Sequence, residues 1–245
     1  MPLKIDDLYS NVALAGLRDA LSTTHKIEYV ADKGPNWGSQ IDGNNAQITF
    51  TDSPNPQESL AHELLHLALQ KDGYQRMRYG TCSFTLDDKW FGNLISCLDN
   101  ELQHQRMYPR YLELGFDASK FYGESAKEMR RYYNRLLQES NGDIRTVMTG
   151  YLSLVAPGGS LPEDERAEFI QRFKAIHKRS YATSLTQVDE ALAAWRQQES
   201  LNAEDTARQI IRAMQTPSET FIGYGTTDEF PENGFFIDDV FTLEH

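Results

Sequence analysis

The chain has 245 residues, of which 40% are hydrophobic, and its formal net charge is −12. This apolar share can build one large or two small folded domains, and it excludes wholesale disorder. No apolar run approaches the roughly 20 residues that cross a bilayer, so a membrane partner is not expected. The acidic excess repels phosphate backbones, so a nucleic acid partner is not expected either.

The first residues of the chain and its cysteines indicate the cellular compartment of the protein. Residues 1–10 lack the apolar segment of a secretory signal, which predicts a cytoplasmic protein. Two cysteines, Cys82 and Cys97, are too few for a disulfide framework, and this fits a reducing compartment. Residues 243–245 resemble the remnant of a cloning tag and are excluded from the functional argument.

The N-terminal half is predicted to combine helices with a small sheet. A helical stripe over residues 8–21 is formed by Leu8, Val12, Leu14, Leu17 and Leu21. Alternating residues and turn chemistry within 26–51 predict a small antiparallel meander. A second, amphipathic helix is predicted to begin at Pro56 and to end at Gln70.

The remainder is predicted to be mostly helical. Residues 71–89 indicate an irregular connection, and a further helix starts near Trp90 and is ended or kinked by Pro109. About five helices should follow Gly115, and a terminal hairpin or tail should close the chain. The fold class is therefore α+β, with one domain at 1–156 and a helical region at 157–242, or with both parts in one continuous domain.

The second predicted helix carries a His-Glu-x-x-His motif formed by His62, Glu63 and His66. Residues four apart lie one helical turn above each other, so both imidazoles can bind one zinc ion while Glu63 reaches a water beside it. The competing interpretation is a helix with hydrogen-bonded histidines and a Glu63 that simply faces water.

A catalytic zinc ion commonly takes three protein ligands, so a third is needed. Asp72 is a poor candidate because Leu69 stands where a turn toward the metal requires glycine. Glu101 and His104 lie three residues apart on one face of the next predicted helix, and both remain candidates. The alternative for this pair is a partly exposed helix end.

Residues 46–108 resemble the gluzincin branch of the zinc metallopeptidases, in the motif His62-Glu63-Leu64-Leu65-His66 and in the order of the predicted elements. The resemblance implies zincin-type active-site helices against a small antiparallel sheet, with Glu101 as the third zinc ligand. Gln105 stands where that group often has an aspartate beside a ligand histidine. His104 therefore stays open as the third ligand or as a group that acts on the transition state.

The predicted function is a zinc-dependent metallopeptidase that hydrolyses a peptide or another amide bond. Glu63 would act as general base, and His104 or Tyr108 would donate to the tetrahedral oxyanion. The substrate would be a peptide or a protein. Weaker candidates for the oxyanion donor are Tyr74, Arg76, Arg78 and Tyr79.

Two alternative functions compete with the peptidase. The first is a zinc-binding regulatory or protein-interaction module without hydrolytic activity. The second is a di-iron carboxylate protein, because Glu63/His66 and Glu101/His104 are two Glu-x-x-His units. Such proteins need further glutamates, and none lies between His66 and Glu101, which makes the di-iron function less favourable.

Overall fold

The structure is a computed structural model that describes residues 3–34, 36–82, 88–139, 144–175, 179–214 and 220–238. It confirms the α+β class and the helical C-terminal half. Contacts divide the chain into two units, each assembled from several segments. Unit 1 is Met1–Tyr74, Arg106–Met129 and Pro157–Leu161, and unit 2 is Gln75–Gln105, Arg130–Ala156 and Pro162–His245. The domain boundaries at 1–156 and 157–242 stay a prediction, and the suspected tag at 243–245 lies outside the described residues.

Unit 1 begins with two helices where one was predicted. Helix α1 (Ile5–Leu8) is separated from α2 (Val12–Ser22) by Asn11, whose side chain accepts hydrogen bonds from the amides of Ala13 and Leu14. This N-cap satisfies amide groups that have no partner within the helix. Val12, a member of the predicted helical stripe, is 86% exposed, so it does not share the burial of Leu14 and Leu21.

The sheet of unit 1 is mixed rather than an antiparallel meander. Strand β2 (Gly38–Asp42) pairs antiparallel with β3 (Asn45–Phe50), as predicted. Strand β1 (Lys26–Ala31) pairs in parallel with β3, from Lys26 opposite Asn45 to Ala31 opposite Phe50. The strand order is therefore β1-β3-β2, and β3 lies in the centre.

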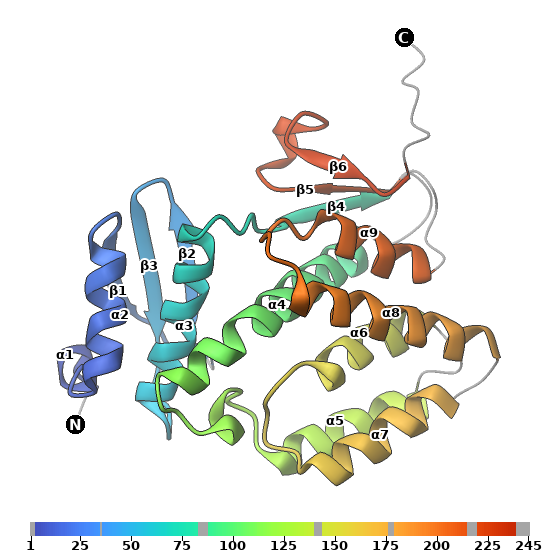
Figure 1. Cartoon of the computed structure of the whole chain (residues 1–245), viewed down its shortest axis with the longest axis horizontal. Helices are drawn as coiled ribbons and strands as arrows, with labels where there is room; N and C mark the ends of the chain where they lie inside the picture. Colours follow the sequence, from blue (N-terminus) through green and yellow to red (C-terminus); the bar gives the residue numbers. More distant parts are fainter. Residues whose placement is uncertain are drawn as a thin grey trace. The chain divides into compact units, whose positions relative to one another are not determined.

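Helix α3 (Pro56–Lys71) follows β3 and carries the His-Glu-x-x-His motif. Pro56 occupies the first turn, where its missing N–H costs nothing. The helix packs against β2, β3 and α2, as Figure 1 shows. Its residues from Leu60 to Leu69 are buried except for His62, so the helix is covered around most of its circumference rather than on one face.

Helix α4 (Asp88–Glu113) continues four residues beyond Pro109, so Pro109 does not end the helix, and the alternative of a kink stays a prediction. Its residues up to Gln105 belong to unit 2, and its last two turns belong to unit 1. In unit 1 these turns are followed by the short helix η1 (Ala118–Lys120), which Asp117 caps through the amide of Ser119.

Unit 2 contains a second three-stranded sheet, which is antiparallel throughout. The predicted terminal hairpin is confirmed as β5 (Thr220–Gly223) and β6 (Gly234–Phe236). Strand β4 (Tyr79–Cys82) pairs with β5, and it lies inside the segment that was predicted to be irregular. The short helix η2 (Thr227–Glu229) lies in the loop between β5 and β6.

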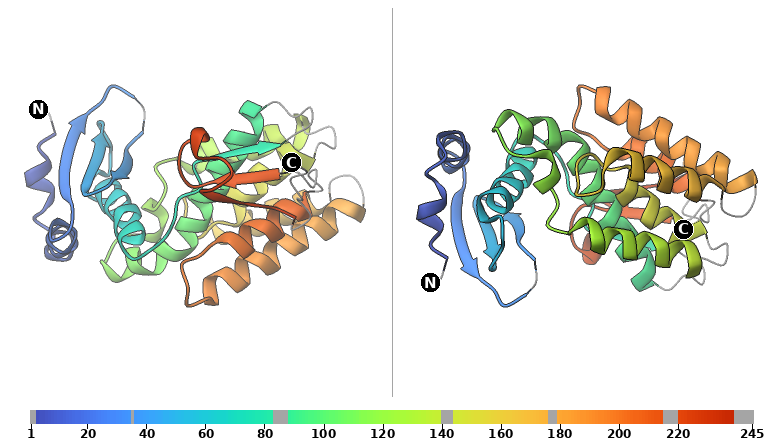
Figure 2. Two further views of the ribbon diagram at one scale, coloured as in Figure 1. Left: turned by 90° about the horizontal axis from the view of Figure 1, so that it is seen from above. Right: turned by 90° about the horizontal axis from the view of Figure 1, so that it is seen from below.

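Five α-helices follow Gly115 in the described residues, as predicted. They are α5 (Ala126–Glu139), α6 (Ile144–Val155), α7 (Glu163–Ala175), α8 (Arg179–Gln197) and α9 (Glu204–Ala213). Helix α8 contacts α6, α7 and α9, and Figure 2 shows α8 and α9 side by side. No helix among the described residues is long and apolar enough to cross a membrane.

A buried carboxylate fixes the start of β4 to α4 within unit 2. Asp99 is 1% exposed and accepts hydrogen bonds from the Met77 amide at 2.9 Å and from Gln103 Nε2 at 2.8 Å. Arg76 Nε lies 3.3 Å from the same carboxylate. Three donors stabilise this buried carboxylate. If the carboxylate is removed, the donors stay buried without an acceptor, and this lowers the stability of the fold.

We expect Asp99→Ala to lower the free energy of unfolding by about 3 kcal/mol, because the Met77 amide and the Gln103 side chain lose their acceptor. Asp72→Ala is the matched control, since that exposed carboxylate forms a surface ion pair with Arg110 at 2.8 Å. It should cost less than about 1 kcal/mol. Urea unfolding followed by circular dichroism measures both, and equal losses would contradict the prediction.

Candidate metal centre

The two motif histidines come together on α3, within unit 1. His62 Nε2 and His66 Nε2 lie 3.1 Å apart, and the ring centroids are 4.9 Å apart. Two nitrogen ligands that each lie 2.0–2.1 Å from a tetrahedral zinc ion are separated by roughly 3.3 Å. The spacing of the two Nε2 atoms therefore fits a shared metal ion, and the predicted one-turn arrangement of the imidazoles is confirmed.

Glu63 lies between the two histidines in the sequence and is 7% exposed. The part of the competing interpretation in which Glu63 faces water is therefore wrong, whereas its hydrogen-bonded histidines agree with the 3.1 Å contact between the two imidazoles. A carboxylate that is largely removed from water retains its charge only where polar or charged groups stabilise it. This burial is unusual for a glutamate on a helix and marks Glu63 as a candidate functional group.

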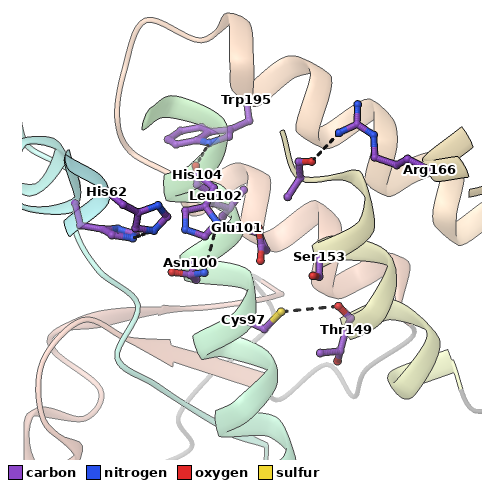
Figure 3. Close-up of polar contacts among 12 residues, drawn as sticks. His62, Cys97, Asn100, Glu101, Leu102, His104, Thr149, Ser153, Arg166 and Trp195 are labelled. Carbon is purple, nitrogen blue, oxygen red and sulfur yellow. Dashed lines mark hydrogen bonds and ion pairs between the residues drawn. The ribbon is translucent and has the colours of Figure 1, made fainter. Parts of the chain in front are cut away.

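Glu101 and His104 come together on α4, within unit 2. Glu101 Oε2 lies 3.0 Å from His104 Nδ1, and the two residues are 5% and 2% exposed. Figure 3 shows both side chains beside Asn100, whose Nδ2 lies 3.5 Å from the same His104 nitrogen. The alternative of a partly exposed helix end is excluded.

The part of α4 that carries this pair is held by α8. Trp195 is fully buried, and its Nε1 donates to the Leu102 carbonyl at 2.8 Å, a contact drawn in Figure 3. Arg196 Nη1 donates to Gln105 Oε1 at 2.9 Å. Gln105, the departure from the gluzincin pattern, is thus a buried acceptor for an arginine, and its interaction with α8 steadies the helix beside His104.

The other predicted residues are placed as follows. Tyr108 is half-buried in unit 1, with its ring edge-on to Phe121 at 5.3 Å. Asp72 is exposed at the end of α3, which agrees with its exclusion as a ligand. The remaining oxyanion candidates are dispersed: Tyr74 is buried in unit 1, Arg76 pairs with Asp99, Arg78 is exposed, and Tyr79 packs on Phe221.

Two aromatic neighbours of the motif were missed by sequence reasoning. Phe121 is 2% exposed in unit 1, and its ring centroid lies 4.8 Å from that of His62. Tyr122 follows it, with its ring 6.5 Å from that of His62. Neither residue belongs to a recognisable motif, since an isolated Phe-Tyr pair after a turn carries no local signal of what it contacts.

Cys97 lies one turn before Glu101 on α4, and the negative charge of Glu101 affects the pKa of its thiol. Its Sγ lies 3.8 Å from the Thr149 carbonyl, as Figure 3 shows. Burial, reinforced by the negative charge of Glu101, raises the pKa of the Cys97 thiol to about 12. At neutral pH the residue is therefore a thiol rather than a reactive thiolate.

We expect Cys97 in the folded protein to react with iodoacetamide at pH 8 at least about a hundredfold more slowly than in the urea-unfolded chain, because the thiolate is the nucleophile. The experiment uses Cys82→Ser protein, so that Cys97 alone is labelled, and mass spectrometry follows the modification. Similar rates in the folded and unfolded protein would contradict this prediction.

Comparison with protein-family models, curated proteins and solved structures found no match to the chain. Its function therefore has to be inferred from its own residues. Three histidines, His62, His66 and His104, each offer an imidazole nitrogen suited to binding a metal ion. The first two belong to unit 1 and the third to unit 2.

Proposed function

We propose that the protein is a zinc-dependent hydrolase that cleaves a peptide or another amide bond. The observation that supports this best is the 3.1 Å separation of the His62 and His66 Nε2 atoms on a buried helix, with a buried glutamate between them in the sequence. This combination of two imidazoles and one carboxylate is the donor and base set of zinc peptidases.

We prefer His104 to Glu101 as the third ligand. The contact between Glu101 Oε2 and His104 Nδ1 leaves Nε2 as the nitrogen that would bind a metal. Histidine ligands commonly donate their other ring N–H to a carboxylate, which fixes the tautomer and the ring orientation. In this assignment His62, His66 and His104 hold the ion, and Glu101 orients His104.

When bound, a zinc ion polarises the substrate carbonyl and lowers the pKa of coordinated water toward about 7. Glu63 accepts a proton from the attacking water and passes it to the leaving amine. Tyr108, which is half-buried beside Phe121, is the proposed donor to the oxyanion.

The test is hydrolysis of a mixed peptide library by protein loaded with Zn²⁺, measured as newly formed amino termini. We expect cleavage that stops after treatment with a chelator and returns when Zn²⁺ is added. One tightly bound zinc ion per chain without any cleavage would instead support the binding or regulatory module. Absence of stoichiometric metal would contradict the proposed site.

A further inference from the structure

Five aromatic residues of unit 1 form a cluster next to the motif helix. We define the aromatic cluster as Tyr108, Tyr111, Phe116, Phe121 and Tyr122. Its members come from the last two turns of α4 and from the segment that follows this helix. Tyr111 and Phe121 are almost fully buried, so the cluster is part of the core of unit 1.

Phe121 is the centre of the aromatic cluster. Its ring is edge-on to Tyr111 at 5.0 Å and to Tyr122 at 5.2 Å, in addition to its contact with Tyr108. Edge-to-face contacts of this kind favour one ring orientation, because the positive edge of one ring meets the negative face of the other. Phe121 therefore presents a fixed surface to the ring of His62, 4.8 Å away.

Gly158 closes the cluster from another part of the chain. Its φ is +79°, and a Cβ at this position would lie 2.8 Å from Tyr108 Cε2 and 3.0 Å from Phe121 Cβ. The left-handed backbone and this close approach both require glycine. The segment 157–159 thus limits movement of Phe121 and Tyr108 on the side where Gly158 approaches them.

We propose that Phe121 is a positioning residue that holds the His62 imidazole in the orientation in which its Nε2 faces His66 Nε2. This inference rests on the proposed metal site. An imidazole that rotates freely must be ordered when a metal binds, and this ordering weakens the affinity. The contact with Phe121 orders the ring in advance, and Gly158 is the residue that permits Phe121 to be held so tightly.

The experiment measures Zn²⁺ affinity by competition with a chromophoric chelator, together with the visible spectrum of the Co²⁺-substituted protein. Phe121→Leu keeps an apolar side chain but removes the ring, and we expect the dissociation constant for Zn²⁺ to rise about tenfold, as for other residues that orient ligands. The Co²⁺ spectrum should change as well, because the ligand field depends on the orientation of His62. Circular dichroism establishes that the variant is folded.

Tyr111→Phe is the matched control, because it keeps the ring that packs on Phe121 and removes only a hydroxyl. Its affinity and Co²⁺ spectrum should equal those of the parent protein. Gly158→Ala provides an independent variant that displaces Phe121 without replacing it, and it should also weaken binding at least about fivefold. If Phe121→Leu does not fold, the Zn²⁺ affinity of Gly158→Ala tests the positioning role of Phe121.

The outcomes separate this inference from the proposed function. If the parent protein binds Zn²⁺, and Phe121→Leu and Gly158→Ala bind it with dissociation constants within twofold of the parent value and with unchanged Co²⁺ spectra, the positioning role of Phe121 is overturned. The proposed metal site would stand in that case. A parent protein that binds no stoichiometric metal would overturn the metal site, and the positioning role with it. Weaker binding in both variants, with the control unchanged, would support the inference.

Discussion

Glu63→Gln is expected to lower the rate of hydrolysis by about 10²- to 10⁴-fold, because the amide cannot accept a proton from water. The substitution keeps the size of the side chain and both histidines, so one Zn²⁺ per chain should remain bound. Glu63 is buried, and a neutral amide is less costly to bury than a carboxylate. We therefore expect α3 to stay folded in this variant.

Glu58→Gln is the matched control for this experiment. Glu58 lies in the first turn of the same helix and pairs with Lys120 at 3.0 Å, so the chemical change is identical but lies more than one turn from the motif histidines. Its activity should stay within about twofold of the parent, since loss of a single ion pair has a small effect. Unchanged hydrolysis by Glu63→Gln would remove Glu63 from the mechanism.

The motif helix shows what local sequence can predict. Pro56 and the leucine spacing gave nearly correct limits for α3, because these signals act within one helix. The spacing of four residues between His62 and His66 also predicted their mutual approach, since helical geometry alone determines it. The three-residue spacing of Glu101 and His104 placed them on one face for the same reason.

The burial of that helix could not be predicted in the same way. The sequence favoured an amphipathic helix, whereas the residues of α3 from Leu60 to Leu69 are all buried except for His62. Periodicity reports which residues prefer to be buried, but it does not report how many neighbours the chain supplies. Val12 is the converse case, an apolar residue with helical spacing that stays 86% exposed.

Pairing between segments that are distant in the chain was the hardest feature to predict from the sequence. The four residues of β4 form a strand because β5, about 140 residues later, supplies hydrogen-bond partners. The parallel pairing of β1 with β3 is hidden for a similar reason, because a local turn predicts only the β2–β3 hairpin. Phe121 contacts His62 through such a nonlocal arrangement, which explains why it was missed.

Substitution of either motif histidine is expected to have the largest effect on metal binding. His62→Ala and His66→Ala should each weaken Zn²⁺ affinity by more than about a hundredfold, because each removes one of three proposed ligands and the free energy of binding depends on the number of ligands. Isothermal titration with Zn²⁺ measures this loss. His25→Ala is the control, since that imidazole contacts Thr24 after α2 and is not one of the three histidines grouped as possible metal ligands among the described residues.

The same titration distinguishes His104 from Glu101 as the third ligand. His104→Ala should weaken binding as much as loss of a motif histidine does, whereas Glu101→Ala should cost about tenfold to a hundredfold, the effect of losing a group that orients a ligand. The reverse order, with Glu101→Ala the more damaging, would assign the carboxylate to the metal and leave His104 to stabilise the oxyanion. Glu101→Gln sharpens the comparison, because an amide oxygen can still accept the His104 N–H but is a poorer zinc ligand than a carboxylate. Near-parent affinity in Glu101→Gln alongside loss in His104→Ala is therefore the result expected if the three histidines are the ligands.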